Sequence, residues 1–166
     1  MVEIRQVELD GWRELRDVRL AALLDAPTAF GSTYEDSVAR SDEQWQKRLE
    51  AGPMFIAYLD GKAIGLSGGF VEEDGSYELV SMWVDPVARG KRVAEQLVNV
   101  VAAWARGLGA ARLHLWVTDG NESAQRLYER LGFTYTGERQ ELPSNPQLTE
   151  VGMAMPLQLS EDAARP

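Results

Sequence analysis

The first half of the chain changes from an alternating to a helical pattern of apolar residues. Within residues 2–7, the apolar Val2 and Ile4 alternate with the charged Glu3 and Arg5, which predicts a strand. After Asp10 the apolar residues recur at helical spacing as far as Pro27, which predicts a helix that ends there. Ser41 begins a capping-box pattern, so we expect a second helix that runs through Leu49.

Two apolar runs, Met54–Leu59 and Ala63–Val71, flank the dipeptide Asp60-Gly61. Asp-Gly readily adopts the positive φ angles of a tight turn, so this pattern predicts a β-hairpin. A further turn at residues 73–75 leads to a third strand at Tyr77–Val84. The sequence therefore predicts three consecutive antiparallel strands after the two helices.

Helical spacing returns in the second half of the chain. Apolar residues from Val93 to Trp104 predict a helix that ends near Gly107 or Gly109. Because this helix connects the strand at Tyr77–Val84 to the next strand, we expect those two strands to be parallel, with a right-handed crossover. The remaining predicted elements are a strand at Leu113–Val117, a helix at Asn121–Leu131 stopped by Gly132, and strands at Phe133–Gly137 and Thr149–Leu157.

The composition limits the classes of function. With 166 residues and 45% hydrophobic content, the chain fits one domain over residues 1–159, followed by a tail at 160–166 that we expect to be disordered. A net charge of -9 argues against a nucleic-acid partner and fits a cationic or amine substrate. The chain has no cysteine and a single histidine, so thiol chemistry is excluded and no metal site is expected. The N-terminus lacks a secretory pattern and no apolar run could span a membrane, so we expect a cytoplasmic protein with no membrane partner.

The sequence R-G-K-R-V-A, Arg89 to Ala94, lies between a predicted strand and a predicted helix. A helix start offers unpaired backbone N–H groups and the positive end of the helix dipole, and three basic side chains add charge. The pattern is neither a P-loop nor a dinucleotide-binding fingerprint, because the required glycines and hydroxyl are missing. From the turn alone, an anion site and a solvated cationic helix start are equally good interpretations.

Two stretches together resemble the GNAT superfamily of N-acetyltransferases: V-D-P-V-A-R-G-K-R-V-A from Val84 and N-E-S-A-Q-R-L-Y-E-R-L-G-F from Asn121. The first departs from the family pattern at Arg92, where a glycine is usual. The resemblance implies an α/β (α+β) fold with a mixed, mostly antiparallel twisted sheet of about seven strands, about four helices, and a central parallel strand pair that splays around the cofactor. It also implies acetyl-CoA as acyl donor and allows a homodimer.

The resemblance assigns the cofactor site to three parts of the chain. The pantetheine arm would pair with the backbone of Met82, Trp83 and Val84. The pyrophosphate would rest on backbone N–H groups of Arg89, Gly90, Lys91, Arg92, Val93 and Ala94. Asn121 and Ala124 would approach the pantetheine arm, and Asn121 could instead cap the helix that follows it.

Two residues are candidates for proton transfer. Tyr128 matches the family's general acid, since a phenol with a pKa of ~10 can protonate a departing thiolate; the alternative is a core tyrosine. Glu78 aligns with the general base of the family's histone-modifying members; the alternatives are a solvated strand-edge residue and an amine deprotonated through water. We expect His114 to be a partly buried histidine with hydrogen-bond partners, with a proton relay as the alternative. From family architecture, Tyr34 and Glu35 are predicted to lie in a loop that forms a wall of the acceptor site.

These features predict an acetyl-CoA-dependent N-acetyltransferase in which a primary amine attacks the thioester directly. One alternative is a non-catalytic acyl-CoA binding or sensing domain, which would need the turn at Arg89–Ala94 but neither Tyr128 nor Glu78. Another is an acetyltransferase that modifies protein N-termini or lysines, so the acceptor is a small-molecule or peptide amine.

Overall fold

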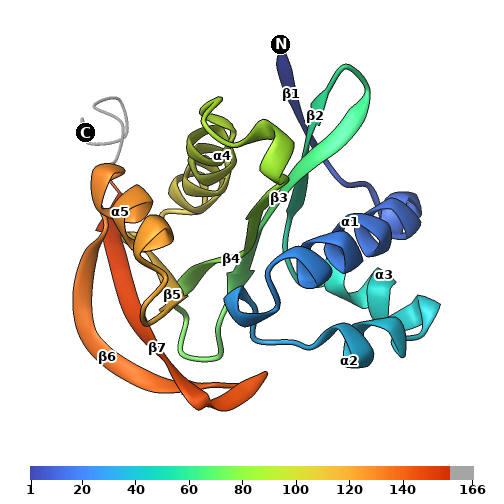
Figure 1. Cartoon of the computed structure of the whole chain (residues 1–166). Coiled ribbons are helices and arrows are strands. Elements are labelled where there is room, and N and C mark those ends of the chain that lie inside the picture. The colour runs from blue at the N-terminus through green and yellow to red at the C-terminus, as the bar shows by residue number, and fades with distance from the viewer. Residues whose placement is uncertain (158–166) are drawn as a thin grey trace.

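A computed structural model describes residues 1–157 of the chain, and the predicted disordered tail at 160–166 lies outside them. The strands form one sheet in the order β1-β2-β3-β4-β5-β7-β6 (Figure 1). All neighbouring strands are antiparallel except β4 and β5. The mixed, mostly antiparallel sheet expected from the sequence is confirmed. The strands are β1 (Val2–Gln6), β2 (Met54–Leu59), β3 (Lys62–Val71), β4 (Tyr77–Val84), β5 (Arg112–Thr118), β6 (Thr134–Leu142) and β7 (Asn145–Pro156).

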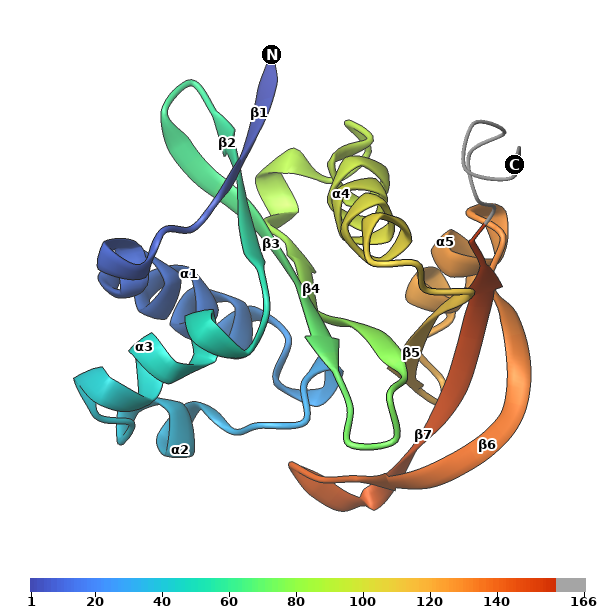
Figure 2. The same ribbon diagram turned by 180° about the vertical axis from the view of Figure 1, so that it is seen from behind.

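Helices cover the two faces of the sheet unequally. In both views, α1, α2 and α3 lie together on one side of β3 and β4, and α4 lies on the other side (Figures 1 and 2). The buried apolar residues accordingly form one cluster under α1 and α3 and others under α4 and α5. The α-helices are α1 (Trp12–Asp25), α2 (Tyr34–Val38), α3 (Asp42–Ala51), α4 (Val93–Gly107) and α5 (Glu122–Arg130).

The segment predicted as a loop before the second helix contains short helices, which corrects that expectation. A 3-10 turn spans Pro27–Ala29 and α2 begins at Tyr34. The Thr33 hydroxyl accepts a hydrogen bond from the Asp36 amide at 3.1 Å and so caps α2. Five residues are too few to show a helical period, which is why the apolar pattern did not reveal this helix.

The last two strands are longer than predicted. β6 and β7 meet at a turn around residues 143–144, whereas the sequence indicated only Phe133–Gly137 and Thr149–Leu157. Every residue of β6 except Leu142 is exposed, so no alternation between buried and exposed positions marks this edge strand.

A bulge in β4 reverses which side chains face each layer. Leu66 pairs with Trp83, but Gly68 pairs with Val80, so β4 carries one extra residue, and Ser81 there has a φ of 59°. Leu79 consequently packs under α4, whereas Trp83 packs under α1, although the two are four residues apart. Ser81 lies on the α1 side, where its hydroxyl contacts Arg19.

The parallel strands β4 and β5 separate almost as soon as they meet. Glu78 and His114 form the one residue pair between them in the described chain, although β4 continues to Val84 and β5 to Thr118. The splayed strand pair predicted from the family resemblance is therefore present. It leaves the C-terminal half of β4 without a partner strand on its β5 side.

Candidate active site

A cavity of about 400 Å³ lies beside the unpaired half of β4. Met82, Trp83 and Val84 form one wall, and residues from α5 form the opposite wall. The structure thus brings together seven of the predicted cofactor residues, together with Tyr128. The seven are Met82, Trp83, Val84, Arg89, Ala94, Asn121 and Ala124.

A second cavity of about 390 Å³ adjoins the first at the start of α4. Gly90, Arg92 and Val93 line this cavity, and Arg89 and Ala94 line both, whereas Lys91 is exposed and lines neither. The first amides of α4 have no intrahelical acceptor, so they and the helix dipole favour an anion here. The two cavities form a channel from the start of α4 to the divergence of β4 and β5, and these residues fit a phosphate-bearing thioester.

Arg92 occupies the position at which the family motif has a glycine. Its backbone adopts a left-handed conformation, which explains why glycine is usual at this position. Its φ of 61° and ψ of 21° are left-handed, and Gly90, two residues earlier, has a φ of 82°. A side chain costs about 1–2 kcal/mol in this region, whereas glycine enters it freely. The backbone of the turn therefore keeps the shape that a glycine would favour, and the Arg92 amide group is retained.

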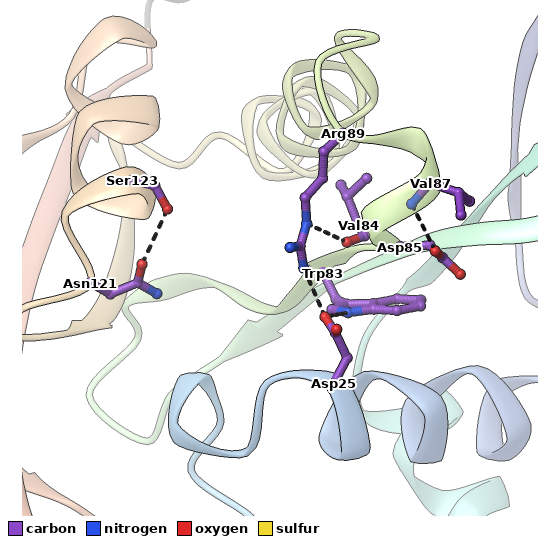
Figure 3. A network of polar contacts seen from close by, with 8 residues as sticks. All are labelled: Asp25, Trp83, Val84, Asp85, Val87, Arg89, Asn121 and Ser123. Atoms are coloured by element: carbon purple, nitrogen blue, oxygen red, sulfur yellow. Dashed lines mark hydrogen bonds and ion pairs between the residues drawn. The ribbon is translucent and has the colours of Figure 1, made fainter.

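Arg89 is held away from the α4 amides by a contact that the sequence did not reveal. Its guanidinium donates to Asp25 Oδ2 at 2.7 Å and to the Val84 carbonyl at 3.2 Å (Figure 3). Asp25 Oδ2 also accepts from Trp83 Nε1 at 2.9 Å. Asp25 ends α1 in a stretch without a motif, so no sequence pattern indicates its contact with Arg89. The Val84 carbonyl oxygen, one of the backbone groups predicted to pair with pantetheine, therefore already accepts a hydrogen bond from the Arg89 side chain.

Tyr128 lies on α5 with its ring buried against Phe133 at a centroid distance of 5.6 Å. It is 7% exposed and lines the 400 Å³ cavity. Burial raises the pKa of the Tyr128 phenol above its usual value, so the hydroxyl stays protonated at neutral pH. A protonated donor in this position suits a general acid.

Asn121 is the N-cap of α5, where its side chain accepts from the Ala124 amide at 3.4 Å. Its Oδ1 also lies 3.5 Å from the Ser123 hydroxyl, and both side chains lie across from Arg89 (Figure 3). The helix-capping role considered for Asn121 is therefore confirmed, and its contact with the cofactor stays a prediction.

Glu78 lies in a different cavity from Tyr128. This cavity of about 920 Å³ is on the face of β4 and β5 that α4 does not cover, and Glu72, His114 and Trp116 also line it. Trp116 Nε1 donates to Glu78 Oε1 at 3.1 Å. Burial, followed by the neighbouring Glu72, raises the pKa of Glu78 to about 8. In its deprotonated form, which becomes populated as the pH approaches 8, such a carboxylate can take a proton from an ammonium group. Trp116 and Glu72 were not among the predicted site residues.

His114 is only partly as expected. It lies on the same face of β5 as Trp116 and is partly buried, but its Nδ1 atom is buried with no hydrogen-bond partner within residues 1–157. The expectation of a histidine with satisfied ring nitrogens is therefore wrong for Nδ1.

The predicted acceptor residues lie on α2. Tyr34 packs against the apolar cluster under α1, and Glu35 is exposed. Neither lines the cavity around Glu78 or the cavity around Tyr128. Their role in acceptor binding stays a prediction, and within the described chain no three acidic or histidine side chains are arranged to hold a metal ion. No described helix is both long and apolar enough to cross a membrane.

Comparison with known proteins identifies the family. The profile of the Acetyltransferase (GNAT) family matches residues 15–133, so the chain belongs to this family. The family prediction from the two motifs is confirmed. The mycothiol acetyltransferase of Thermomonospora curvata is 34% identical over 113 residues, which cover 68% of this chain and 37% of that protein. The human N-acetylaspartate synthetase is 33% identical over 96 residues, which cover 57% of this chain and 32% of that protein. The chain thus spans about a third of the length of these relatives.

Solved structures share the fold. A GNAT acetyltransferase from Streptococcus pneumoniae superposes with a TM-score of 0.77 at 21% identity, covering 95% of this chain and 100% of that one. The ribosomal-protein-S18-alanine N-acetyltransferase from Escherichia coli superposes with a TM-score of 0.70 at 19% identity, covering 98% of this chain and 97% of that one. A structure from Salmonella typhimurium solved with its cofactor acetyl-CoA gives 0.72 at 18% identity, covering 96% of each chain. These likenesses confirm the fold class predicted from the sequence.

Proposed function

We propose that this protein is an acetyl-CoA-dependent N-acetyltransferase that moves an acetyl group to a primary amine without a covalent enzyme intermediate. The observation that carries the proposal is the gap between β4 and β5, with Tyr128 on one side and Glu78 on the other. Acetyl-CoA would supply the acetyl group as a thioester and leave as a thiolate. Its pyrophosphate would lie at the α4 amides and its pantetheine arm along Met82, Trp83 and Val84.

The two proton transfers take place on opposite sides of the gap between β4 and β5. Glu78 faces the cavity opposite α4, and with a pKa of about 8 it can accept the proton that the acceptor amine must lose. Tyr128 lines the cofactor cavity and donates a proton to the sulfur as the carbon–sulfur bond breaks. The amine nitrogen attacks the carbonyl carbon, so one proton is removed at Glu78 and one is supplied at Tyr128. The separation of these residues into two cavities supports entry of donor and acceptor from opposite faces.

The relatives support an amine acceptor but differ in its identity. Their names, mycothiol acetyltransferase and N-acetylaspartate synthetase, describe different products. A small-molecule or peptide amine is therefore the acceptor class that we propose, with Tyr34 and Glu35 as candidate contacts. A cytoplasmic location suits a reaction that consumes acetyl-CoA, and a homodimer is compatible with the exposed edge strand β6.

An amine panel with detection of free thiol tests the proposal. Amino acids, polyamines, aminoglycosides and N-terminal peptides are supplied with acetyl-CoA, and thiol release is compared with release in the absence of amine. Amine-dependent release that is lost in Glu78→Gln supports the proposed function. Tight acetyl-CoA binding without release for any amine would instead indicate a sensing domain.

A further inference from the structure

Three arginines gather around a small cavity on the α1 side of the β4 bulge. Arg19 from α1, Arg40 from the segment before α3, and Arg48 from α3 line a cavity of about 160 Å³ together with Trp45 and Ser81. The cavity is far larger than the ~10–15 Å³ that one water needs. This concentration of positive charge lies in a chain whose net charge is -9.

The cluster has no counter-charge of its own. Within residues 1–157 none of the three guanidinium groups forms a salt bridge, although the sequence holds 26 acidic residues. Burial, followed by the other two arginines, lowers the pKa of Arg19 to about 10. Burying like charges together without an anion is costly, because each loses hydration and repels the others.

Two buried donors on residues that line the cavity also lack acceptors. Arg19 is 9% exposed and its Nε has no hydrogen-bond partner in the described chain, and Trp45 is 2% exposed with its Nε1 likewise unpartnered. The Arg19 guanidinium donates to the Ser81 hydroxyl at 2.5 Å, which fixes it beside the bulge. Buried N–H groups are rarely left without an acceptor, so both indicate a missing oxygen ligand.

The arginines are held by contacts that leave their charge free. Arg19 stacks on Phe30 at 4.8 Å and Arg40 stacks on Trp45 at 5.1 Å. Arg48 donates to the carbonyl oxygens of Gly52 and Gly69 at 3.2 and 3.3 Å. Stacking and carbonyl contacts orient the guanidinium groups but do not neutralise them. The site is therefore preorganised for a carboxylate or phosphate oxygen.

The position of the cavity connects it to the reaction. Ser81 directly precedes Met82, which lines the cofactor cavity, and it lies three residues from Glu78 on the same strand, a span of about 10 Å. The bulge turns Ser81 toward the α1 side, opposite the side of Leu79. A short acceptor could place its amine near Glu78 and an anionic group among the arginines.

We propose that Arg19, Arg40 and Arg48 form a subsite for an anionic oxygen group, carboxylate or phosphate, carried by the acceptor amine. The proposal rests on the proposed acetyltransferase function for the acceptor's identity, but the anion site itself does not. The acceptor class is therefore an amine with an acidic group, such as an amino acid or a phosphorylated amine, and not a polyamine.

The anion site is tested without acetyl transfer by the indole N–H signal of Trp45 in a nitrogen-15 correlation spectrum, assigned with Trp45→Phe. Sodium acetate and inorganic phosphate are titrated against sodium chloride at constant ionic strength. We expect the Trp45 signal to shift in the wild type and in Arg16→Gln, a partly exposed arginine on the same helix, but not in Arg19→Gln. Arg40→Gln, at a less buried position, serves if Arg19→Gln does not fold. An unmoved Trp45 signal in the wild type overturns the anion site.

The assignment to the acceptor is tested by matched pairs of amines that differ only in a carboxylate or a carboxamide. We expect the wild type to favour the carboxylate in kcat/KM by about tenfold or more, and Arg40→Gln to lose most of that ratio while Arg16→Gln keeps it. An equal ratio in the wild type and Arg40→Gln overturns the acceptor assignment and means that a free anion occupies the cavity. If no amine releases thiol, the proposed function and the acceptor assignment both fail, while the Trp45 titration still decides the anion site.

Discussion

Replacing Arg92 by glycine should stabilise the protein. Arg92 has a φ of 61°, and its carbonyl accepts from the Gln96 amide at 3.3 Å, a contact that glycine retains. The left-handed conformation costs an arginine about 1–2 kcal/mol relative to glycine. Glycine loses more entropy on folding, which offsets about 0.4–1 kcal/mol of that gain. We therefore expect Arg92→Gly to raise the free energy of unfolding by roughly 0.5–1 kcal/mol and the melting temperature by roughly 1–4 °C.

Two control variants separate backbone conformation from charge in this experiment. Arg92→Ala removes the exposed guanidinium but keeps the left-handed conformation, so its melting temperature should stay near that of the wild type. Gly90→Ala should lower the free energy of unfolding by about 1 kcal/mol, because Gly90 has a φ of 82° and an added Cβ would meet nothing within 4 Å. Differential scanning calorimetry measures all three. If Arg92→Gly melts at or below the wild-type temperature while Gly90→Ala is destabilised, the conformational argument for Arg92 is refuted.

The remaining predictions concern the proposed active site. Tyr128→Phe should lower kcat by about 100-fold with an unchanged calorimetric Kd for acetyl-CoA, and unchanged turnover would return Tyr128 to a core role. In the wild type kcat/KM should rise with pH through about 8, the pKa of Glu78, and Glu78→Gln should abolish that rise. The raised pKa means that the folded state holds the Glu78 proton more tightly than the unfolded state. The free energy of unfolding should therefore fall as pH increases from 4.5 to about 8. Thermal melts at several pH values should show this fall in the wild type and not in Glu78→Gln. Asp25→Asn keeps an acceptor for Trp83 but removes the charge that holds Arg89, so acetyl-CoA should bind up to about fivefold tighter by calorimetry; weaker binding would show that the ion pair organises the site.

The parts of the fold that bury one face could be predicted from the sequence. α4 carries Leu97, Val98 and Val101 at helical spacing because they pack on the sheet, and the Asp60-Gly61 turn has the positive φ angles that its residues favour. β6 and α2 could not be delimited, since β6 buries almost nothing and α2 is only five residues long. Apolar periodicity reflects burial, and turn residues reflect turns. An element that has neither feature therefore cannot be delimited from the sequence pattern.

The residues of the site also fall into a group that the sequence predicts and a group that it does not. The turn at Arg89–Ala94 and the cap at Asn121 are local in sequence, and the structure places them around one channel. Asp25, Trp116 and the three arginines act through contacts between residues far apart in the chain, such as Arg19 with Ser81, 62 residues away. The bulge in β4 and the packing of α1 and α3 bring the arginines together, whereas Trp116 reaches Glu78 from the neighbouring strand β5. No local sequence pattern indicates these contacts.

Thermal unfolding in the presence of acetyl-CoA tests most directly whether the gap between β4 and β5 is the cofactor site. At about 100 times its Kd, acetyl-CoA should add roughly 2.7 kcal/mol to the free energy of unfolding, equivalent to roughly 5–11 °C in the melting temperature. Ala94 lines both cavities of the channel, so Ala94→Phe should abolish the increase. A wild-type protein whose melting temperature does not change with acetyl-CoA, or an Ala94→Phe variant that responds as strongly as the wild type, would contradict the proposed site.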